Sequence, residues 1–199
     1  MSDITIGVLA LQGDFIDHAR MIEELGVKTK LVKSAEDLET INGIIIPGGE
    51  SFVIEKLAKL FGVFEPLRKK ILDGMPVYGT CAGMIMLANK ILDGNDGQEG
   101  LGVMNVTVRR NAFGRQVDSY EEDLEVVGLE KPFRGIFIRA PWVEEIGNEI
   151  EVLSRTYSRS SEGNIVAVRQ KNMLATSFHP EVGKDNSFHE LFVNMCMKE

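Results

Sequence analysis

The chain has 199 residues, slightly more than a typical single domain and too few for two, and its 44% hydrophobic and 26% charged residues are typical of a globular protein. Its formal net charge of -8 would repel a phosphate backbone, so no nucleic acid is expected as a partner. The amino terminus has no basic segment, and the apolar run 4–11 is too short to cross a bilayer, which predicts a cytoplasmic protein with no membrane partner. We therefore expect one domain over residues 1–199.

Short apolar runs alternate with helix-period segments in the first half of the chain, which is typical of an α/β fold with a parallel sheet wrapped by helices. The expected strands are residues 4–10, 28–32, 44–46 and 76–78. The first expected helix has an apolar face of Phe15, Ile16, Ala19 and Ile22, and a capping box at 34–37 opens a short second one. A long helix is expected over 52–72, with points of interruption at Gly62 and Pro66. A further helix is expected over 84–91.

Alternating or β-branched runs dominate the second half, which predicts antiparallel additions to the sheet. The expected strands are residues 103–108, 124–127, 136–138, 150–153, 165–168 and 173–178, the last two joined by a turn near Lys171 and Asn172. A closing helix is predicted by a capping box at 187–190 and an apolar stripe of Phe188, Leu191, Phe192 and Met195. Because His189 lies within that capping box, we expect it on the surface.

A nucleophile motif stands between an expected strand and an expected helix, at Gly79-Thr80-Cys81-Ala82-Gly83. A G-x-nucleophile-x-G turn needs small flanking residues because its central residue has a strained backbone and its neighbours pass close to other elements. The helix start would also favour the thiolate form of Cys81. The alternative for Cys81 is a small buried apolar residue, the commonest fate of a free cysteine.

The second cysteine, Cys196, serves as a comparison because it lies in the closing helix with no glycine beside it. For Cys196 we expect a core or surface role. Two cysteines are too few for a disulfide framework, and no pair of Cys or His residues has the short spacing of a structural zinc site, so no metal is expected.

A general base for the thiol is offered by His179, which follows an expected strand that ends at Pro180. Residues two apart in an extended chain face the same side, so Glu181 could bond the far nitrogen of His179 and fix its tautomer. The alternative is an exposed pair at a strand end. His18 lies on the expected polar side of the first helix, as a surface residue or an interface group.

Oxyanion donors are predicted at Pro47-Gly48-Gly49-Glu50-Ser51, which follows the third expected strand as Cys81 follows the fourth. Both segments would open at the carboxyl edge of the sheet, where α/β folds bind ligands. The amides of Gly49 and Ala82 could together hold an oxyanion. The alternative is an ordinary glycine-rich entry to a helix.

Together these motifs resemble the class I, triad-type glutamine amidotransferases, and within them the glutaminase subunits of pyridoxal 5'-phosphate synthase. The resemblance covers nearly the whole chain in order. The blocks that carry it are Leu11-Gln12-Gly13 with His18, Pro47-Gly48-Gly49-Glu50-Ser51, Gly79-Thr80-Cys81-Ala82-Gly83, Arg110-Asn111-Ala112-Phe113-Gly114-Arg115-Gln116, Phe137-Ile138-Arg139-Ala140-Pro141 and Ser177-Phe178-His179-Pro180-Glu181. The chain departs from the pattern at Phe52 and Val53, where small hydroxyl residues are expected, and in a longer loop from Tyr157 to Gly163.

The resemblance implies a three-layer flavodoxin-like fold with a mixed, mostly parallel sheet, helices on both faces and antiparallel additions in the second half. It implies a catalytic triad of Cys81, His179 and Glu181, and glutamine contacts at Gly48, Gly49, Glu50, Arg110, Ile138 and Arg139. From the residues alone, Arg110 and Arg139 could either pair with Glu50 or meet the glutamine carboxylate.

The implied reaction is hydrolysis of L-glutamine to L-glutamate and ammonia through a Cys81 thioester, with no cofactor bound to this chain. The implied partner is the synthase subunit, which uses the ammonia to build pyridoxal 5'-phosphate. The resemblance also implies that docking on the synthase activates the glutaminase by reorienting the backbone at Gly48 and Gly49, a change that glycine makes easy. Three alternatives remain: a glutaminase of the histidine or purine pathway, a cysteine peptidase or redox-sensing protein with a similar turn, and a binding module without catalysis.

Overall fold

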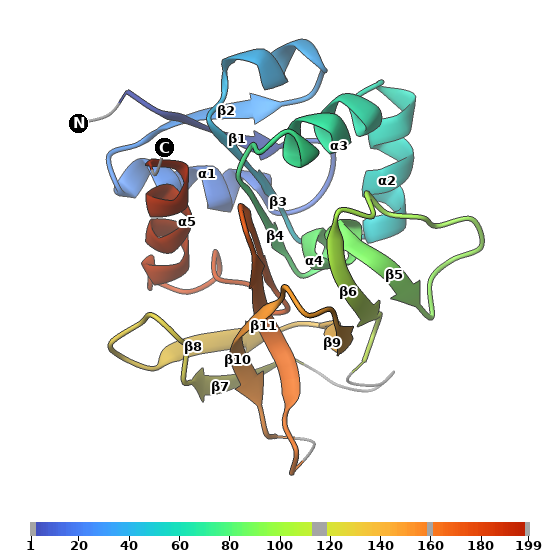
Figure 1. The fold of residues 1–199 in the computed structure, drawn as a ribbon. Helices are drawn as coiled ribbons and strands as arrows, with labels where there is room; N and C mark the ends of the chain where they lie inside the picture. The colour runs from blue at the N-terminus through green and yellow to red at the C-terminus, as the bar shows by residue number, and fades with distance from the viewer. Residues whose placement is uncertain (1–2, 113–118, 159–160, 198–199) are drawn as a thin grey trace.

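A ten-stranded mixed sheet forms the centre of the molecule, which a computed structural model describes over residues 3–112, 119–158 and 161–197 (Figure 1). Nine strands follow the order β2-β1-β3-β4-β12-β11-β9-β6-β5, β10 pairs with β11, and β7 and β8 form a separate two-stranded sheet. The strands are β1 (Thr5–Leu9), β2 (Lys28–Val32), β3 (Gly43–Ile46), β4 (Val77–Thr80), β5 (Ala88–Leu92), β6 (Met104–Arg109), β7 (Tyr120–Leu124), β8 (Phe133–Phe137), β9 (Trp142–Ile146), β10 (Glu151–Thr156), β11 (Asn164–Gln170) and β12 (Met173–Thr176).

The parallel part of the sheet joins β2, β1, β3, β4 and β12. One row of the register runs from Val8 through Ile45 and Tyr78 to Leu174. Since these strands point the same way, their carboxyl ends meet at one edge, and the loops that follow β1, β3, β4 and β12 become neighbours.

The second half of the chain adds antiparallel pairs, as predicted. β11 and β12 form a hairpin whose turn includes Lys171, with a positive φ of 52°. β9 pairs antiparallel with β11 and β6, and β10 pairs antiparallel with β11. In Figure 1, β9 and β10 lie at the end of the molecule away from α2 and α3, whereas β6 lies closer to α2 and α4.

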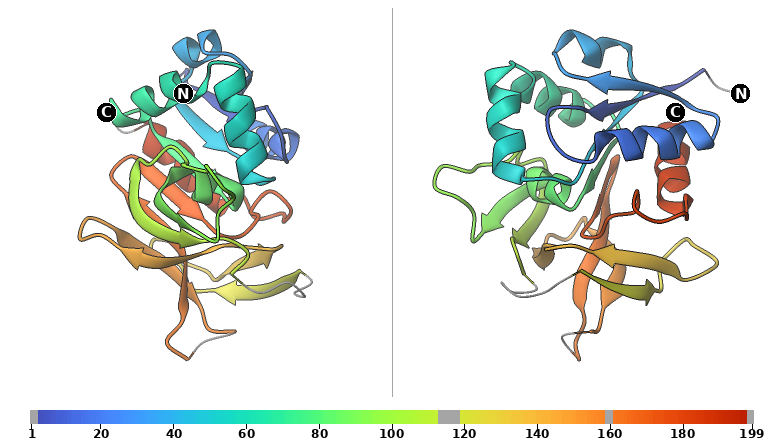
Figure 2. Two further views of the ribbon diagram at one scale, coloured as in Figure 1. Left: turned by 90° about the vertical axis from the view of Figure 1, so that its right-hand side faces the viewer. Right: turned by 180° about the vertical axis from the view of Figure 1, so that it is seen from behind.

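Helices cover both faces of the sheet (Figures 1 and 2). α1 and α5 lie together on one side, and α2, α3 and α4 lie on the other. Among the helices of the described ranges, none is long and apolar enough to cross a bilayer. The helices are α1 (Phe15–Glu24), the 3-10 helix η1 (Glu36–Thr40), α2 (Ser51–Leu60), α3 (Phe64–Leu72), α4 (Ala82–Leu87) and α5 (Ser187–Met197).

Strand β3 illustrates how the sequence produces two cores. Ile44 and Ile46 pack into the cluster under α2, α3 and α4, whereas Ile45 faces the cluster under α1 and α5. All three side chains are fully buried. Burial of each contributes about 1.5–3 kcal/mol relative to exposure, so an uninterrupted apolar run suits a strand that is covered on both faces.

The predicted long helix over 52–72 is two helices. The break contains Gly62, which has a positive φ of 68°, while Pro66 lies inside α3 near its start, where a proline breaks few hydrogen bonds. The short helix predicted after the capping box at 34–37 is the 3-10 helix η1. Only one bond of the predicted box forms, in which Asp37 Oδ2 accepts the Ser34 N–H at 3.0 Å.

The capping box predicted at 187–190 is also wrong. α5 begins at Ser187, and the Ser187 N–H donates to Asp185 Oδ1 at 2.9 Å, so the polar cap comes from upstream. The apolar stripe of this helix was predicted correctly at its two largest members, since Phe188 and Phe192 are fully buried.

The predicted helix over 84–91 is wrong in its second half. α4 ends at Leu87, and residues 88–92 form β5, which pairs parallel with β6. The helix was predicted because the apolar residues of this segment are also spaced as in a helix. The strand that pairs with it, β6, lies outside the local sequence window. The structure also places β9 at 142–146, where no strand was predicted, and β7 at 120–124 rather than 124–127.

Candidate active site

Four loops at the carboxyl edge of the parallel strands surround one cavity of about 400 Å³. They follow β1, β3, β4 and β12, which are consecutive in the sheet. Two segments from the second half of the chain complete the wall. The lining residues are Gln12, Asp14, Gly49, Glu50, Ser51, Cys81, Ala82, Ile85, Arg110, Asn111, Ile138, Arg139 and His179.

Cys81 stands at the turn from β4 into α4 with φ 48° and ψ -101°. Its N–H donates to Thr176 O at 2.8 Å, and its carbonyl accepts the Ile85 N–H at 3.3 Å, which holds the strained backbone in place. The flanking glycines are sterically required: a Cβ at Gly83 would overlap Ile46 O, and one at Gly79 would lie 2.5 Å from Gly83 O. The strand, turn and helix that the motif predicted are therefore all present.

His179 lies beside Cys81, although 98 positions separate them in the chain. It follows β12, and its N–H donates to Ile136 O at 2.8 Å. The ring packs against Gly48, where a Cβ would be 2.6 Å from His179 Cε1. Burial of the ring lowers the pKa of His179, but the hydrogen bonds and negative charges of Cys81 and Glu181 outweigh burial and raise it above its ordinary value. The imidazole is thus held ready to carry a proton.

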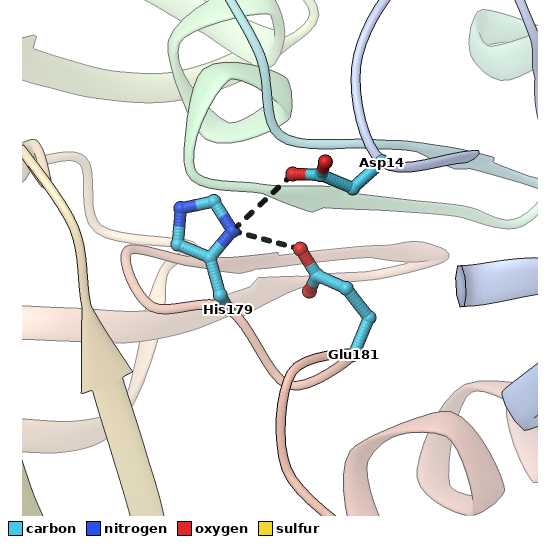
Figure 3. Close-up of side chains that lie close together, drawn as sticks. All are labelled: Asp14, His179 and Glu181. Carbon is cyan, nitrogen blue, oxygen red and sulfur yellow. Dashed lines mark hydrogen bonds and ion pairs between the residues drawn. The ribbon is translucent and has the colours of Figure 1, made fainter. Parts of the chain in front are cut away.

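Glu181 is the hydrogen-bond partner of the far ring nitrogen (Figure 3). His179 Nδ1 lies 2.7 Å from Glu181 Oε1, and the glutamate is buried with 1% exposure. This contact directs Nδ1–H to the carboxylate and leaves the other ring nitrogen for the thiol. The two-residue spacing noted in the sequence therefore produces the expected contact.

Asp14 approaches the same nitrogen from the loop after β1, with its Oδ2 at 3.9 Å from His179 Nδ1 (Figure 3). One atom each from Asp14, His179 and Glu181 lies within 4.8 Å of the others, a spacing that could hold a metal ion. The carboxylate of Glu181 already accepts the Nδ1 proton, however, so a hydrogen-bonded triad accounts for the geometry.

The glycine pair after β3 lies against the loop after β1. Gly48 O accepts the Asp14 N–H at 3.3 Å, and Gly49 has a positive φ of 148°. Because the peptide between the two glycines is trans, the Gly49 N–H points away from Asp14. The side chain of Gln12 supports this loop by accepting the Glu50 N–H at 2.8 Å. Ala82, the other expected oxyanion donor, is the first residue of α4 and lines the cavity.

Glu50 and Arg110 are paired, which is one of the two arrangements left open for this arginine. Arg110 Nη2 donates to Glu50 Oε1 at 2.9 Å, and its Nη1 donates to Gln98 Oε1 at 2.9 Å. The Glu50 carboxylate also caps α2 by accepting the Val53 N–H at 2.8 Å. Arg110 is thereby fixed in a network on the cavity wall.

Ile138 and Arg139 also line the cavity, directly after β8. Ile138 O is 4.0 Å from Cys81 Sγ. Arg139 has a positive φ of 47° and an exposed side chain, for which no ion pair is found among the described residues. Its positive charge is therefore available at the cavity. Of the block that begins at Arg110, residues 113–116 lie outside the described residues.

The two other histidines are buried: the surface position expected for His189 is wrong, and His18 lies on the buried face of α1 rather than on its polar side. His18 is buried because the inner face of α1 consists of Phe15, His18, Ala19 and Ile22, whereas Ile16 is 60% exposed. His189 is buried because the stripe of α5 extends beyond Phe188 to the adjacent residue. The two rings contact each other, with His18 Nδ1 at 2.9 Å from His189 Nε2. Neither expectation allowed for a polar cluster inside the core.

Cys196 has none of the features of Cys81. It is partly buried against the core on the α5 side, away from the cavity lining, and burial raises the pKa of its thiol to about 12. A raised pKa disfavours the thiolate, so this cysteine behaves as a packing residue.

Sequence reasoning did not assign roles to three polar residues that line or support the cavity, namely Asp14, Ser51 and Gln98. The signal for Asp14 was present, because it follows β1 just as Gly48 follows β3. Gln98 carried no signal, since it lies in a loop whose position depends on contacts with distant residues.

Comparisons with known proteins place this geometry in a family. The model of the SNO glutamine amidotransferase family matches residues 8–198. A protein from Nocardioides sp. named pyridoxal 5'-phosphate synthase subunit PdxT is 54% identical over 195 residues, which cover 98% of this chain and 97% of that protein.

A protein of the same name from Streptomyces coelicolor is 54% identical over 197 residues, covering 98% of this chain and 95% of the other. A crystal structure of a glutamine amidotransferase, 46% identical, superposes with a TM-score of 0.88 over 96% of this chain and 98% of that one. The chain belongs to the SNO glutamine amidotransferase family.

Proposed function

We propose that this chain hydrolyses L-glutamine to L-glutamate and ammonia and passes the ammonia to a pyridoxal 5'-phosphate synthase subunit. The observation that carries the proposal is the contact of Cys81, His179 and Glu181 at one cavity, in a chain that belongs to the amidotransferase family. The names of its relatives favour the pyridoxal pathway over the histidine and purine pathways.

In the acylation step, His179 holds the proton of the Cys81 thiol, and Sγ attacks the side-chain amide carbon of glutamine as the thiolate. The tetrahedral intermediate collapses when the imidazolium returns a proton to the leaving nitrogen, which departs as ammonia and leaves a γ-glutamyl thioester. Water then attacks the thioester with His179 as general base, releasing glutamate and restoring the thiol. Glu181 holds the imidazole through Oε1 in both steps.

The oxyanion of each tetrahedral intermediate needs N–H donors near Cys81 Sγ. Ala82, at the start of α4, and Gly49 are the proposed donors. In the structure Gly48 O is held by the Asp14 N–H. We propose that docking of the synthase subunit turns this peptide, since neither glycine has a side chain to oppose the rotation.

Charged groups that line the cavity are proposed to hold glutamine. Arg110 is already paired with Glu50, whereas the exposed Arg139 has no ion pair among the described residues. We therefore assign Arg139 to the α-carboxylate of glutamine and Arg110 to the positioning of Glu50. Gly48, Gly49 and Ile138 supply backbone groups beside the substrate.

A cytoplasmic location is part of the proposal. The cytosol keeps thiols reduced, which suits a thiol nucleophile, and Cys81 and Cys196 are both free. The chain as a whole, residues 1–199, is proposed to act as one glutaminase domain, because both halves supply groups to the same cavity.

Glutamate release from L-glutamine tests the proposal, measured with the chain alone and with its synthase subunit. The complex is expected to release glutamate, and the Cys81→Ala variant is expected to lose at least about 1,000-fold in kcat because the nucleophile is gone. Cys196→Ala, the matched control, should stay within about 2-fold, since this residue only packs in the core.

Equal rates for the Cys81→Ala variant and the unaltered complex would contradict the assigned nucleophile. Equal rates for the isolated chain and the complex would remove the proposed activation at Gly48 and Gly49. Synthesis of pyridoxal 5'-phosphate by the Cys81→Ala complex should return when ammonium salt replaces glutamine, because only the ammonia supply is lost.

A further inference from the structure

The second carboxylate oxygen of Glu181 lies deep in the protein and is not explained by the triad. Oε1 accepts the proton of His179, but Oε2 is buried with no aligned hydrogen-bond donor among the described residues. His18 Nε2 lies 3.3 Å from Oε2, and both side chains have 0% exposure. A buried carboxylate oxygen needs a donor, so the proton state of His18 decides whether this contact is favourable.

His18 is part of a polar chain that crosses the core between α1, β4 and α5. Its Nε2 lies 3.1 Å from Thr80 Oγ1, and its Nδ1 lies 2.9 Å from His189 Nε2. Burial, together with the neighbouring His189 and His179, holds the pKa of His18 well below its ordinary value. Burial also lowers the pKa of His189, to about 4. Both rings are therefore neutral near pH 7, with one proton each.

Two tautomer pairs can satisfy the contact between the two rings, and their consequences differ. If His18 carried its proton on Nδ1, its Nε2 lone pair would face the Glu181 carboxylate, and the buried Nδ1 of His189 would be an N–H without an acceptor. If His189 Nε2–H donates to His18 Nδ1, then His18 Nε2–H faces Glu181 and Thr80. In that case His189 Nδ1, which has no hydrogen-bond partner among the described residues, carries only a lone pair. The second arrangement leaves no buried N–H without an acceptor and no lone pair against the carboxylate.

We propose that His18 is a positioning residue for the glutaminase reaction: its Nε2–H, fixed by His189, holds the second oxygen of Glu181 and so extends the triad to Cys81-His179-Glu181-His18. The inference rests on the proposed function, because it assigns His18 a part in the same reaction. His18 does not touch glutamine or the reacting atoms. It acts by fixing the carboxylate rotation that aims the His179 ring at Cys81.

The charged and titratable surroundings are consistent with a neutral donor in this place. Around His18 they are His189 from α5 and both His179 and Glu181 from the segment after β12. Tyr78, from β4, packs its ring edge-on to His189 with centroids 6.2 Å apart. Among these groups only Glu181 has a carboxylate, so a donor hydrogen from His18 has one strong acceptor to face.

The tautomers can be read directly in the full-length chain labelled with ¹⁵N-histidine, because it contains only three histidines. Long-range ¹H–¹⁵N correlation spectra near pH 7 are expected to show His18 and His189 neutral, each protonated at Nε2. A His18 ring protonated at Nδ1, or at both nitrogens, would overturn the proposal. This measurement does not require the synthase or glutamine turnover.

Kinetics of the complex test the positioning role with matched side chains. A glutamine at position 18 can place an amide N–H near the position of imidazole Nε2, whereas an asparagine reaches only the position of Nδ1. His18→Gln is therefore expected to keep kcat within about 5-fold, while His18→Asn and His18→Leu lower kcat by about 10- to 100-fold with KM within about 2-fold. Unchanged kcat in the Leu variant, or equal loss in the Gln and Asn variants, contradicts the proposal.

A control separates positioning from packing. Ile22, one turn further along α1, is also fully buried but has no polar contact with the triad. Ile22→Val should lower thermal stability and leave kcat unchanged per folded molecule; a fall in kcat equal to that of His18→Leu would show that loosening of α1 alone explains the effect.

If the unaltered complex did not release glutamate, the proposed function would fail first. The rate at which iodoacetamide alkylates Cys81 in the isolated chain would then compare the same His18 variants, and equal rates would overturn the positioning role.

Discussion

The left-handed backbone of Cys81 holds its thiol toward the cavity rather than in the core. Such a conformation costs about 1–3 kcal/mol in a residue with a side chain and persists because neighbouring contacts fix it. Here the contacts are the N–H bond to Thr176 O and the close packing of Gly83 on Ile46. The absence of a side chain at Gly48 leaves the space that the His179 ring occupies. Glycines thus shape the site as much as the reactive side chains do.

Gln98 is expected to affect glutamine binding more than turnover. Its side chain accepts from Arg110 Nη1 and donates to Ser51 Oγ, each at 2.9 Å, and so holds the Arg110 network on the cavity wall. Gln98→Ala should raise KM for glutamine by about 3- to 10-fold and keep kcat within about 2-fold, because the network binds substrate and transition state alike.

Steady-state glutamate release by the complex measures both constants. Asp96→Ala is the matched control, since Asp96 lies exposed in the same loop without a contact to the cavity lining. A fall in kcat with unchanged KM in the Gln98 variant would place this residue in the chemical step and contradict its assignment to the binding wall.

The contacts of the triad could be predicted from local sequence signals: Cys81 lies between Gly79 and Gly83, His179 precedes a proline, and Glu181 is two residues from His179. The buried pair of His18 and His189 could not. Sequence polarity placed His189 on the surface and His18 on the polar side of its helix, whereas the i, i+3, i+4, i+7 spacing from Phe15 to Ile22 includes position 18. Helical spacing was in this case a better guide to burial than the polarity of the residue.

At the scale of elements, α2 is tied to the loop before β6 through a buried carboxylate. Glu55 is 1% exposed, accepts the Gly100 N–H at 3.0 Å and pairs with Lys59 at 2.7 Å. The same loop carries Gln98 to the cavity. Packing of α2 and the position of the substrate wall are therefore linked through one side chain.

Glu55→Gln is expected to lower the free energy of unfolding by about 1–3 kcal/mol, because a charged acceptor of backbone N–H groups is lost from a buried site. Urea denaturation measures the change. Glu130→Gln, in the exposed turn between β7 and β8, is the matched control and should stay within about 0.5 kcal/mol. Equal stability of both variants would show that Glu55 does not hold this loop.

Elements with strong local signals were predicted with accurate bounds, and those fixed by distant partners were not. β2 matches its expected range, and Gly62 separates α2 from α3. The segment that forms β5 was predicted as helix because its apolar residues fit both the helical period and the strand period. Its partner β6 lies beyond a connecting loop, so the deciding pairing is not visible in a local window.

For the whole molecule, the order β1, β3, β4 and β12 brings residues from both ends of the chain to one edge. The alternation of strands and helices predicted the parallel half and its functional edge. It could not predict that β12, from the far end of the chain, lies beside β4, because parallel pairing between distant segments has no local signal. That pairing is what places His179 next to Cys81.

Stability is expected to fall between about pH 6 and pH 4.5 because two neutral histidines are buried. The ordinary pKa of 6.5 applies in the unfolded chain, whereas the folded pKa of His189 is about 4 and that of His18 is well below 6.5. In this window the unfolded state binds protons that the folded state does not, so the free energy of unfolding rises with pH by up to about 1.4 kcal/mol per unit for each ring.

His179 does not contribute to this slope. Its folded pKa is raised, so it is protonated in both states below its unfolded pKa, and its stabilising contribution is lost only as pH rises through the folded pKa. Urea titrations at pH 4.5, 5.25 and 6 measure the slope, which His189→Gln should reduce. A flat profile for the unaltered chain would mean that His18 and His189 are charged in the folded state.

The central claim is that Cys81 forms a covalent intermediate with glutamine at the edge of the parallel sheet. The most direct test is rapid acid quenching of the complex during turnover, followed by mass spectrometry of its peptides. The account predicts a γ-glutamyl adduct on the peptide that contains Cys81, retained in Cys196→Ala and absent in Cys81→Ala. Glutamate release by the Cys81→Ala complex at the unaltered rate, or an adduct on another residue, would contradict it.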